Sequence, residues 1–170
     1  MSKLYIGIDN GVTGSIGFVS DNYDKFILTP VKKEQSYTKA KNIISRVDVV
    51  ALKEVLDGTL KEANVSNSEV MVVMERPLIN PSMFKTSISA SRALEATLGV
   101  VEQMSLPHMY VDSKQWQRCL LPKGTEGSAE LKKASKEIGD RLFPHHKTAI
   151  DKHKDADGLL IAKWAYQERL

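Results

Sequence analysis

The stretch from Tyr5 to Val19 constrains the fold of this chain more than any other. Apolar residues lead into a single carboxylate, Asp9, and the turn-forming sequence Asn-Gly-Val-Thr-Gly precedes a second apolar run that starts at Ser15. This order predicts two strands joined by a tight turn. A carboxylate at the end of a buried strand is costly unless another group compensates its charge. We therefore expect Asp9 to have a partner elsewhere in the chain.

The rest of the sequence alternates between strand-like and helix-like segments. Strands are predicted over residues 4–8, 15–19, 23–28, 69–74 and 108–112, with the first three as an antiparallel meander. Helices are predicted over residues 47–64, 87–104, 116–121, 126–142 and 159–165, the third of them capped by Ser113, whereas residues 31–46 and 145–154 lack a period and are expected to be irregular. This alternation predicts an α/β fold with a five-stranded mixed central sheet and helices on both faces.

Length and composition indicate an ordinary globular protein. The 170 residues, 42% hydrophobic and 26% charged, are expected to form one domain, residues 1–170. No apolar run approaches the roughly 20 residues of a membrane helix, and neither a membrane partner nor a small-molecule substrate is expected. Met1-Ser2-Lys3 leads directly into a strand and Cys119 is the only cysteine, so we expect no signal peptide, no disulfide and a cytoplasmic location. A net charge of +3 permits a nucleic-acid partner without requiring one.

Two further acidic positions repeat the pattern of Asp9. Glu75 ends the apolar strand 69–74, and Asp155-Ala156-Asp157 opens the final helix. If the strands that carry Asp9 and Glu75 are neighbours, about 4.8 Å apart, their carboxylates converge and raise each other's pKa. A divalent cation relieves this repulsion, and oxygen ligands without cysteine favour Mg²⁺, or Mn²⁺ in its place, over Zn²⁺. Two such ions, about 3.5–4 Å apart, are the arrangement used for phosphodiester displacement.

Each acid taken alone also has a structural explanation. Asp9 before Asn-Gly suits a turn, and Glu75 before Arg-Pro suits a solvated strand end. Asp155 suits the N-cap of the last helix, and Asp157 suits its first turn, where the helix dipole favours negative charge. Their co-occurrence in this order is what favours a metal site.

The acidic motifs together resemble those of the RuvC-type Holliday junction resolvases, members of the RNase H-like superfamily, and among these the short RuvC-like proteins of phages. The resemblance rests on Ile-Gly-Ile-Asp-Asn-Gly-Val-Thr-Gly (6–14), Val-Val-Met-Glu-Arg-Pro (72–77) and Asp-Ala-Asp-Gly-Leu-Leu-Ile-Ala (155–162), and spans nearly the whole chain. It implies an RNase H-like fold and an Mg²⁺-dependent endonuclease that nicks branched DNA, such as Holliday junctions, forks or Y-junctions, during recombination, replication or packaging. It also implies that Asp9, Glu75 and Asp157 are the catalytic, metal-binding carboxylates, and that a phage-encoded chain works in the host cytoplasm.

A fourth metal ligand is left open between two residues. The resemblance implies a ligand three or four positions before Asp157, where this chain has Lys154 and His153. If the last helix already runs through residue 153, His153 lies about 40° from Asp157 around the helix and is the better ligand. If the helix starts at Asp155, that carboxylate is free to join the site.

Positive charge gathers between the fifth strand and the last helix. The residues expected to contact DNA phosphates are Lys114, Arg118, Lys132, Lys133 and Lys136, although a solvated helix face of mixed charge explains part of this pattern. Phe84, in the region after Glu75, either stacks on a base, as the resemblance implies, or packs in the core as a helix staple. The pair His145-His146 has no matching ligand set in the sequence and is expected in a surface loop.

The resemblance also implies a homodimer, because a four-way junction has two-fold symmetry and two symmetric nicks need two active sites. The helix over residues 87–104 matches the family's dimer helix. Two other functions remain open. One is a branched-DNA-binding protein with impaired catalysis, which the departure at His153 and Lys154 allows. The other is a fragment of an actin-like or sugar-kinase ATPase, which needs a second lobe and a second glycine-rich phosphate loop that this sequence lacks.

Overall fold

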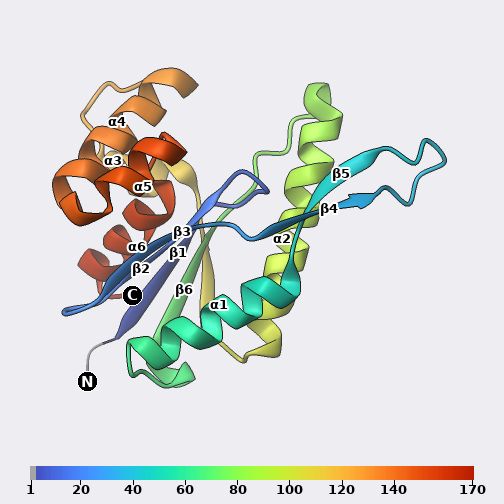
Figure 1. Ribbon diagram of the computed structural model, residues 1–170. Helices are drawn as coiled ribbons and strands as arrows, with labels where there is room; N and C mark the ends of the chain where they lie inside the picture. The colour runs from blue at the N-terminus through green and yellow to red at the C-terminus, as the bar shows by residue number, and fades with distance from the viewer. Residues whose placement is uncertain (1–2) are drawn as a thin grey trace.

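A mixed five-stranded sheet with helices on both faces forms the body of the protein in the computed structural model, which describes residues 3–170 (Figure 1). The strand order is β3-β2-β1-β6-β7, with β1 antiparallel to β2 and parallel to β6. The bounds of these strands are β1 (Leu4–Ile8), β2 (Ser15–Val19), β3 (Asp24–Leu28), β6 (Val70–Glu75) and β7 (His108–Val111). The predicted meander and the predicted mixed sheet are both confirmed.

One face of the sheet is covered by α1 (Val49–Glu62) and α2 (Phe84–Gln103). Side chains alternate between the two faces of a strand, so every second residue of β1 and β6 reaches this side. These residues are all buried and pack together; they are Leu4, Ile6, Ile8, Val70, Val72 and Met74. Asp48 caps α1 by accepting a hydrogen bond from the backbone N–H of Ala51 (3.1 Å).

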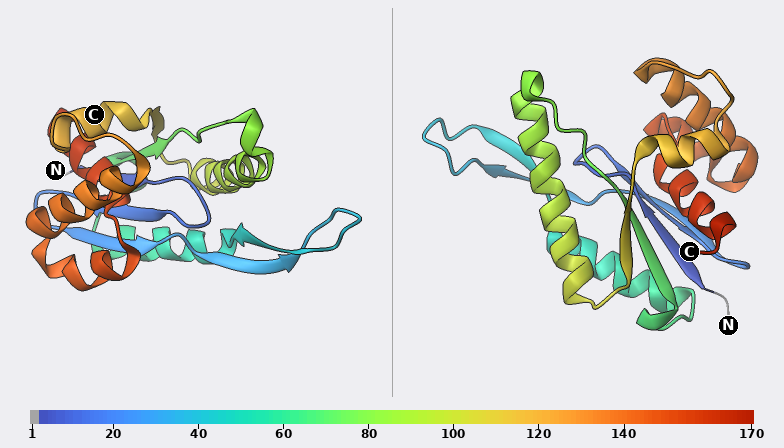
Figure 2. Two further views of the ribbon diagram at one scale, coloured as in Figure 1. Left: turned by 90° about the horizontal axis from the view of Figure 1, so that it is seen from above. Right: turned by 180° about the vertical axis from the view of Figure 1, so that it is seen from behind.

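The other face carries the C-terminal helices, which gather on the side of the sheet opposite α1 and α2 (Figure 2). They are α3 (Ser113–Leu120), α4 (Ser128–Leu142), α5 (Lys147–His153) and α6 (Asp157–Glu168). α6 lies against the strands backbone to backbone, because β1 and β2 have glycine where it crosses them. A Cβ atom on Gly7 would lie 2.3 Å from the backbone N of Ala162, and one on Gly17 would lie 2.4 Å from Cα of Leu159. The two glycines therefore set how closely α6 approaches the sheet.

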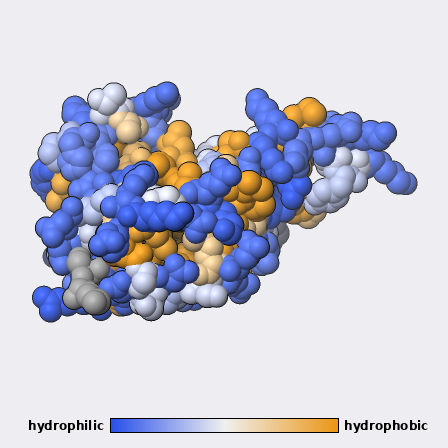
Figure 3. Space-filling model, turned by 60° about the horizontal axis from the view of Figure 1, so that its bottom comes forward, coloured by the Kyte–Doolittle hydropathy of each residue, from blue (hydrophilic) through white to orange (hydrophobic). Residues whose placement is uncertain are grey.

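Residues 31–46 are not irregular, as the sequence predicted. They include most of a hairpin formed by β4 (Val31–Gln35) and β5 (Ile43–Val47), which projects beyond α2 (Figure 1). Most of its side chains are exposed or half-buried, and Figure 3 shows it extending from the body with a largely hydrophilic surface. An arm with little buried surface needs no hydrophobic alternation, which is why the sequence shows no strand period here.

Residues 145–154 are also more regular than predicted. A short 3₁₀ turn, η3 (Pro144–His146), leads into α5. Ile150 is the only buried residue of α5, so this helix has no apolar stripe that the sequence could reveal. The helix ends where Lys154 adopts a left-handed conformation with φ of 79°.

Two helix starts differ from the prediction. α2 begins at Phe84, after the 3₁₀ turn η2 (Pro81–Met83), rather than at Ser87. Asp112, not Ser113, occupies the N-cap position of α3, and its backbone N–H donates to Oε1 of Gln115 (3.0 Å). A further 3₁₀ turn, η1 (Asn67–Glu69), precedes β6. Among residues 3–170, no helix combines the length and the hydrophobicity needed to cross a membrane.

Candidate active site

Asp9 and Glu75 lie side by side at the ends of two parallel strands. The register pairs Ile8 of β1 with Met74 of β6, and one further step sets Asp9 beside Glu75. Because Ile8 and Met74 face α1 and α2, the next residue after each of them faces the opposite side of the sheet, where the C-terminal helices lie. The predicted convergence of these carboxylates thus follows from strand pairing.

Asp157 enters the same region as the first residue of α6. Its carboxylate accepts a hydrogen bond from the hydroxyl of Ser135, and that hydroxyl accepts one from the backbone N–H of Ala156 (3.0 Å). On the other side, the backbone N–H of Gly158 donates to Oγ of Ser15 (3.1 Å). The sequence assigned no role to Ser135, which lies on the buried face of α4 with 1% of its surface exposed. Its hydroxyl fixes the first turn of α6 and the carboxylate that this turn carries.

Both candidates for the fourth ligand lie close to Asp9. α5 ends at His153, and α6 begins at Asp157 with Ala156 at its N-cap, so the continuous helix through residue 153 and the N-cap role of Asp155 are both wrong. The break folds the chain back on itself, and a nitrogen of His153 and carboxylate oxygens of Asp9 and Asp155 all lie within 4.8 Å of one another. Nε2 of His153 lies 3.3 Å from Oδ1 of Asp155. The structure therefore brings together both residues between which the sequence could not choose.

The buried acids carry more negative charge than their surroundings compensate. Burial raises the pKa of Asp9 well above its ordinary value, and the charges of Asp157 and Glu75 raise it further. Burial, followed by the charge of Asp157, raises the pKa of Glu75 to about 7. Burial, followed by the charge of Asp155, raises the pKa of Asp157 to about 6, against the opposing effects of Ser135 and Lys132. Such mutual destabilisation is the electrostatic condition that a bound cation relieves.

The donor set fits a hard divalent cation. Carboxylate oxygens dominate it, with one imidazole, and Mg²⁺ and Mn²⁺ prefer oxygen ligands. Nε2 of His153 is buried, and its 3.3 Å contact with Asp155 does not have hydrogen-bond geometry. Since this atom makes no hydrogen bond among the described residues, it is available as a ligand. The indole Nε1 of Trp116 is likewise buried and has no hydrogen-bond partner among the described residues.

Mg²⁺ is expected to stabilise the protein more at about pH 8 than at about pH 5.5. The folded, metal-free protein holds protons on Glu75 and Asp157 up to about pH 7 and about pH 6, whereas the unfolded chain releases them near pH 4. Glu75 and Asp157 therefore make the metal-free protein less stable as pH rises from about 4 to about 7. At the lower pH, Mg²⁺ must also displace protons from these carboxyl groups before it binds. Thermal melting with and without Mg²⁺ at both pH values tests this, and an equal or larger shift at the lower pH would contradict it.

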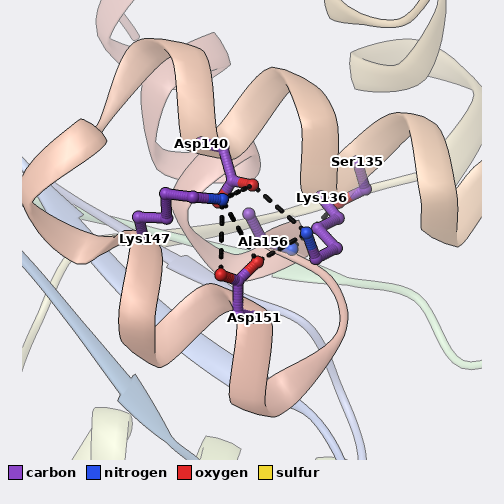
Figure 4. A network of polar contacts seen from close by, with 6 residues as sticks. All are labelled: Ser135, Lys136, Asp140, Lys147, Asp151 and Ala156. Atoms are coloured by element: carbon purple, nitrogen blue, oxygen red, sulfur yellow. Dashed lines mark hydrogen bonds and ion pairs between the residues drawn. The ribbon is translucent and has the colours of Figure 1, made fainter.

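The lysine and arginine side chains that are predicted to contact DNA differ from one another in their surroundings. Lys114 and Arg118 line a groove between α3 and the loop before α4, and Lys133 lies beside that loop. Nζ of Lys132 lies 4.0 Å from Oδ2 of Asp155, and its side chain is 62% exposed. Lys136 instead lies between the carboxylates of Asp140 and Asp151. The sequence alone does not predict that both lie beside it. Its ammonium contacts Asp140 (3.2 Å) and Asp151 (2.5 Å), and Lys147 bridges the same two acids (Figure 4).

Phe84 does not pack in the core, because 68% of its surface is exposed at the start of α2. It lines a groove between α2 and β5 together with Val12, from the turn that follows Asp9, and Arg92. The amide of Asn10 ties this turn to α2 by donating to the backbone carbonyl of Ala90 (3.1 Å). Neither Arg92 nor this link could be identified from the sequence, since both depend on how α2 crosses the sheet.

No protein-family model and no curated protein sequence matches this chain. Solved structures do. The structure of Thermus thermophilus RuvC in complex with a Holliday junction substrate matches with a TM-score of 0.55 and 17% identity, covering 98% of this chain and 95% of that one. A second Thermus thermophilus RuvC structure matches with a TM-score of 0.50, 16% identity and the same coverage.

The chain has the RuvC fold. The yeast mitochondrial Holliday junction resolvase Ydc2 is also similar, with a TM-score of 0.47 and 15% identity over 96% of this chain and 77% of that chain. The RuvC fold is the RNase H-like architecture that the acidic motifs implied, and here it extends from the first strand to the last helix. Within it, Asp9, Glu75 and Asp157 come from β1, β6 and the start of α6.

Proposed function

We propose that this chain is a metal-dependent endonuclease that nicks branched DNA, with residues 1–170 forming one nuclease domain. The observation that carries the proposal is the convergence of buried acids from three distant segments. Burial and the charges of neighbouring acids raise the pKa of Asp9, Glu75 and Asp157. A nitrogen of His153 and carboxylate oxygens of Asp155 and Asp9 lie within 4.8 Å of one another. A protein gains nothing in stability from this arrangement without a cation, so the arrangement serves a function.

Asp9, Glu75, Asp157 and Asp155, with His153, would hold two Mg²⁺ ions, for which Mn²⁺ would substitute. Ions bound there would lower the pKa of a water for attack and would stabilise the leaving oxygen of the phosphodiester. The protein contributes orientation, because Ser135 fixes Asp157 through a hydrogen bond. It also contributes positive charge from Lys132, which reaches Asp155 from α4.

Branched DNA is the proposed substrate because the RuvC structure of similar fold is in complex with a Holliday junction substrate. In this chain the α3–α4 groove with Lys114 and Arg118 would contact phosphates. Exposed Phe84, on the groove that begins at Val12, would stack on a base. We further propose a homodimer through α2, which would present two active sites to the two-fold symmetric junction.

A nicking assay on labelled four-way, Y-shaped and linear duplexes, run with Mg²⁺ and with a chelator, tests this proposal. Nicking of branched substrates that requires the metal is expected, with little cleavage of the linear duplex. Tight junction binding with no nicking at any Mg²⁺ or Mn²⁺ concentration would replace the enzyme with a DNA-binding protein. Cleavage that survives chelation would remove the metal centre from the proposal.

Lys132→Ala is expected to weaken junction binding and to reduce the salt dependence of that binding by about one unit of slope, as for loss of one phosphate contact. Lys136→Ala on the same helix is the matched control. Its ammonium already pairs with Asp140 and Asp151, so its loss is expected to change the slope less. Binding isotherms at several salt concentrations measure both variants, and an equal slope change for the two would contradict the assignment.

A further inference from the structure

A second cluster of metal-ligating side chains lies apart from the acidic site. Nε2 of His145 and Nε2 of His146 both contact Oδ1 of Asp24, the latter at 2.7 Å. One ligand atom from each residue lies within 4.8 Å of the others. The expected surface position is correct for His145, whose side chain is 58% exposed, but the pair lies on a short 3₁₀ turn, and Asp24 supplies a third possible ligand that was not predicted from the sequence. The third residue, Asp24, lies on a strand more than a hundred residues earlier, so the spacing of residues in the sequence does not predict that it joins the two histidines.

Regular elements hold the backbone at all three positions. Asp24 is the first residue of β3 and pairs with Val19 of β2. The two histidines lie on η3, which Pro144 opens and which the backbone N–H of His146 closes onto the carbonyl of Phe143 (2.9 Å). Phe143 itself is buried in the core, with 5% of its surface exposed. Ligands that rigid elements hold in place lose little entropy when a metal binds.

We propose that Asp24, His145 and His146 bind one transition-metal ion of the Zn²⁺ class. Two imidazole nitrogens and one carboxylate oxygen suit Zn²⁺ and its neighbours in the series, whereas Mg²⁺ prefers oxygen ligands alone. The side chains of Asp24, His145 and His146 are 28%, 58% and 18% exposed, which leaves an open side for a water as fourth ligand. On binding, each neutral ring carries its proton on Nδ1, and the Nε2 lone pairs and the Asp24 oxygen turn to the metal.

The site is separate from the acidic centre and is joined to it by one helix. Asp24 begins β3, and Leu28 at the other end of that strand pairs with Ser15, near Asp9; four residues of strand span roughly 13 Å. α5 starts directly after His146 and ends at His153, whose ring packs on Phe26 of β3 with ring centroids 5.9 Å apart. A metal bound to Asp24 would therefore hold the start of α5 in place, and the other end of α5 positions His153 near Asp9.

Zn²⁺ titration of the metal-stripped full chain tests the site, with Co²⁺ absorption as a second probe of the ligand set. The test variants are His145→Gln with His146→Gln, and Asp24→Asn, which keeps an oxygen that accepts hydrogen bonds but removes the charge. His108→Gln is the matched control, because His108 lies on β7 and contacts the carbonyl of Leu106. All are made in a His153→Gln background so that the acidic centre contributes no imidazole. Melting without metal confirms that each variant folds.

The background protein and the His108 variant are expected to bind one equivalent of Zn²⁺ more than the double histidine variant, and this extra equivalent is expected to raise the melting temperature. The affinity is expected to fall about tenfold or more in Asp24→Asn and in the double histidine variant. Imidazole NMR is expected to show Zn²⁺-dependent shifts for His145 and His146. Equal affinity in all variants, or shifts confined to other histidines, would overturn the site. These readouts do not involve DNA, so failure of the nuclease proposal leaves this one standing, and the reverse also holds.

Discussion

Asp9→Asn is expected to reduce metal-dependent nicking of a four-way junction by roughly a thousandfold or more. Asparagine keeps the shape of the side chain but removes the negative charge that the cations need. Losing several kcal/mol of transition-state stabilisation corresponds to this factor. Junction binding is expected to change little, because the phosphate contacts are proposed to come from other residues. Single-turnover nicking and equilibrium junction binding measure the two effects separately.

The same variant makes a second, opposite prediction for stability. Burial and the neighbouring acids disfavour the charged form of Asp9, so neutral asparagine is expected to leave the metal-free protein as stable as the parent or more stable. Asp57→Asn is the control, since Asp57 pairs with Lys53 on the outside of α1 with 43% of its side chain exposed. Full nicking activity in Asp9→Asn, or an activity loss explained by unfolding, would contradict the assignment of Asp9.

Gly7→Ala is expected to destabilise the protein by about 1–3 kcal/mol or more, a typical cost of overpacking a core. The added Cβ would lie 2.3 Å from the backbone N of Ala162 and 2.4 Å from the carbonyl O of Gly158. Backbone atoms cannot rotate out of the way as a side chain can, so α6 must retreat from β1. Asp157 is the first residue of α6 and moves with that helix, so nicking is expected to fall together with stability.

Gly58→Ala provides the matched control for this change. Gly58 lies within α1, and a Cβ added there meets nothing within 4 Å. Alanine in a helix interior is expected to stabilise the protein by roughly 0.5–1 kcal/mol relative to glycine. Urea unfolding measures both variants. A Gly7→Ala protein as stable as the parent would show that α6 is not held at this distance.

The inner strands of the sheet, β1, β2 and β6, could be predicted because they are almost entirely buried. Apolar runs such as residues 70–74 carry a signal that depends only on burial. The hairpin of β4 and β5 has little buried surface, and α5 buries only Ile150. Neither has the hydrophobic period on which sequence reasoning relies, and both were predicted to be irregular. The errors thus fall where the chain folds with few core contacts.

The acidic site divides in the same way. The positions of Asp9 and Glu75 could be predicted because each follows or ends a buried strand, whereas Ser135 contributes only through its tertiary contacts with the first turn of α6. The choice between His153 and Asp155 depended on whether one helix runs through both. It does not, because Lys154 takes a positive φ that non-glycine residues seldom adopt. Nothing in the local sequence indicates that break, and its consequence is that both side chains reach Asp9.

We propose that Asp9, Glu75 and Asp157 lie together because they share divalent cations. Anomalous diffraction from crystals of the protein grown with Mn²⁺ can locate such ions. Mn²⁺ peaks are expected about 2 Å from carboxylate oxygens of Asp9 and Asp157, with Glu75 completing the ligand set. Crystals at saturating Mn²⁺ with no peak beside Asp9, or with Asp9, Glu75 and Asp157 turned away from one another, would contradict it.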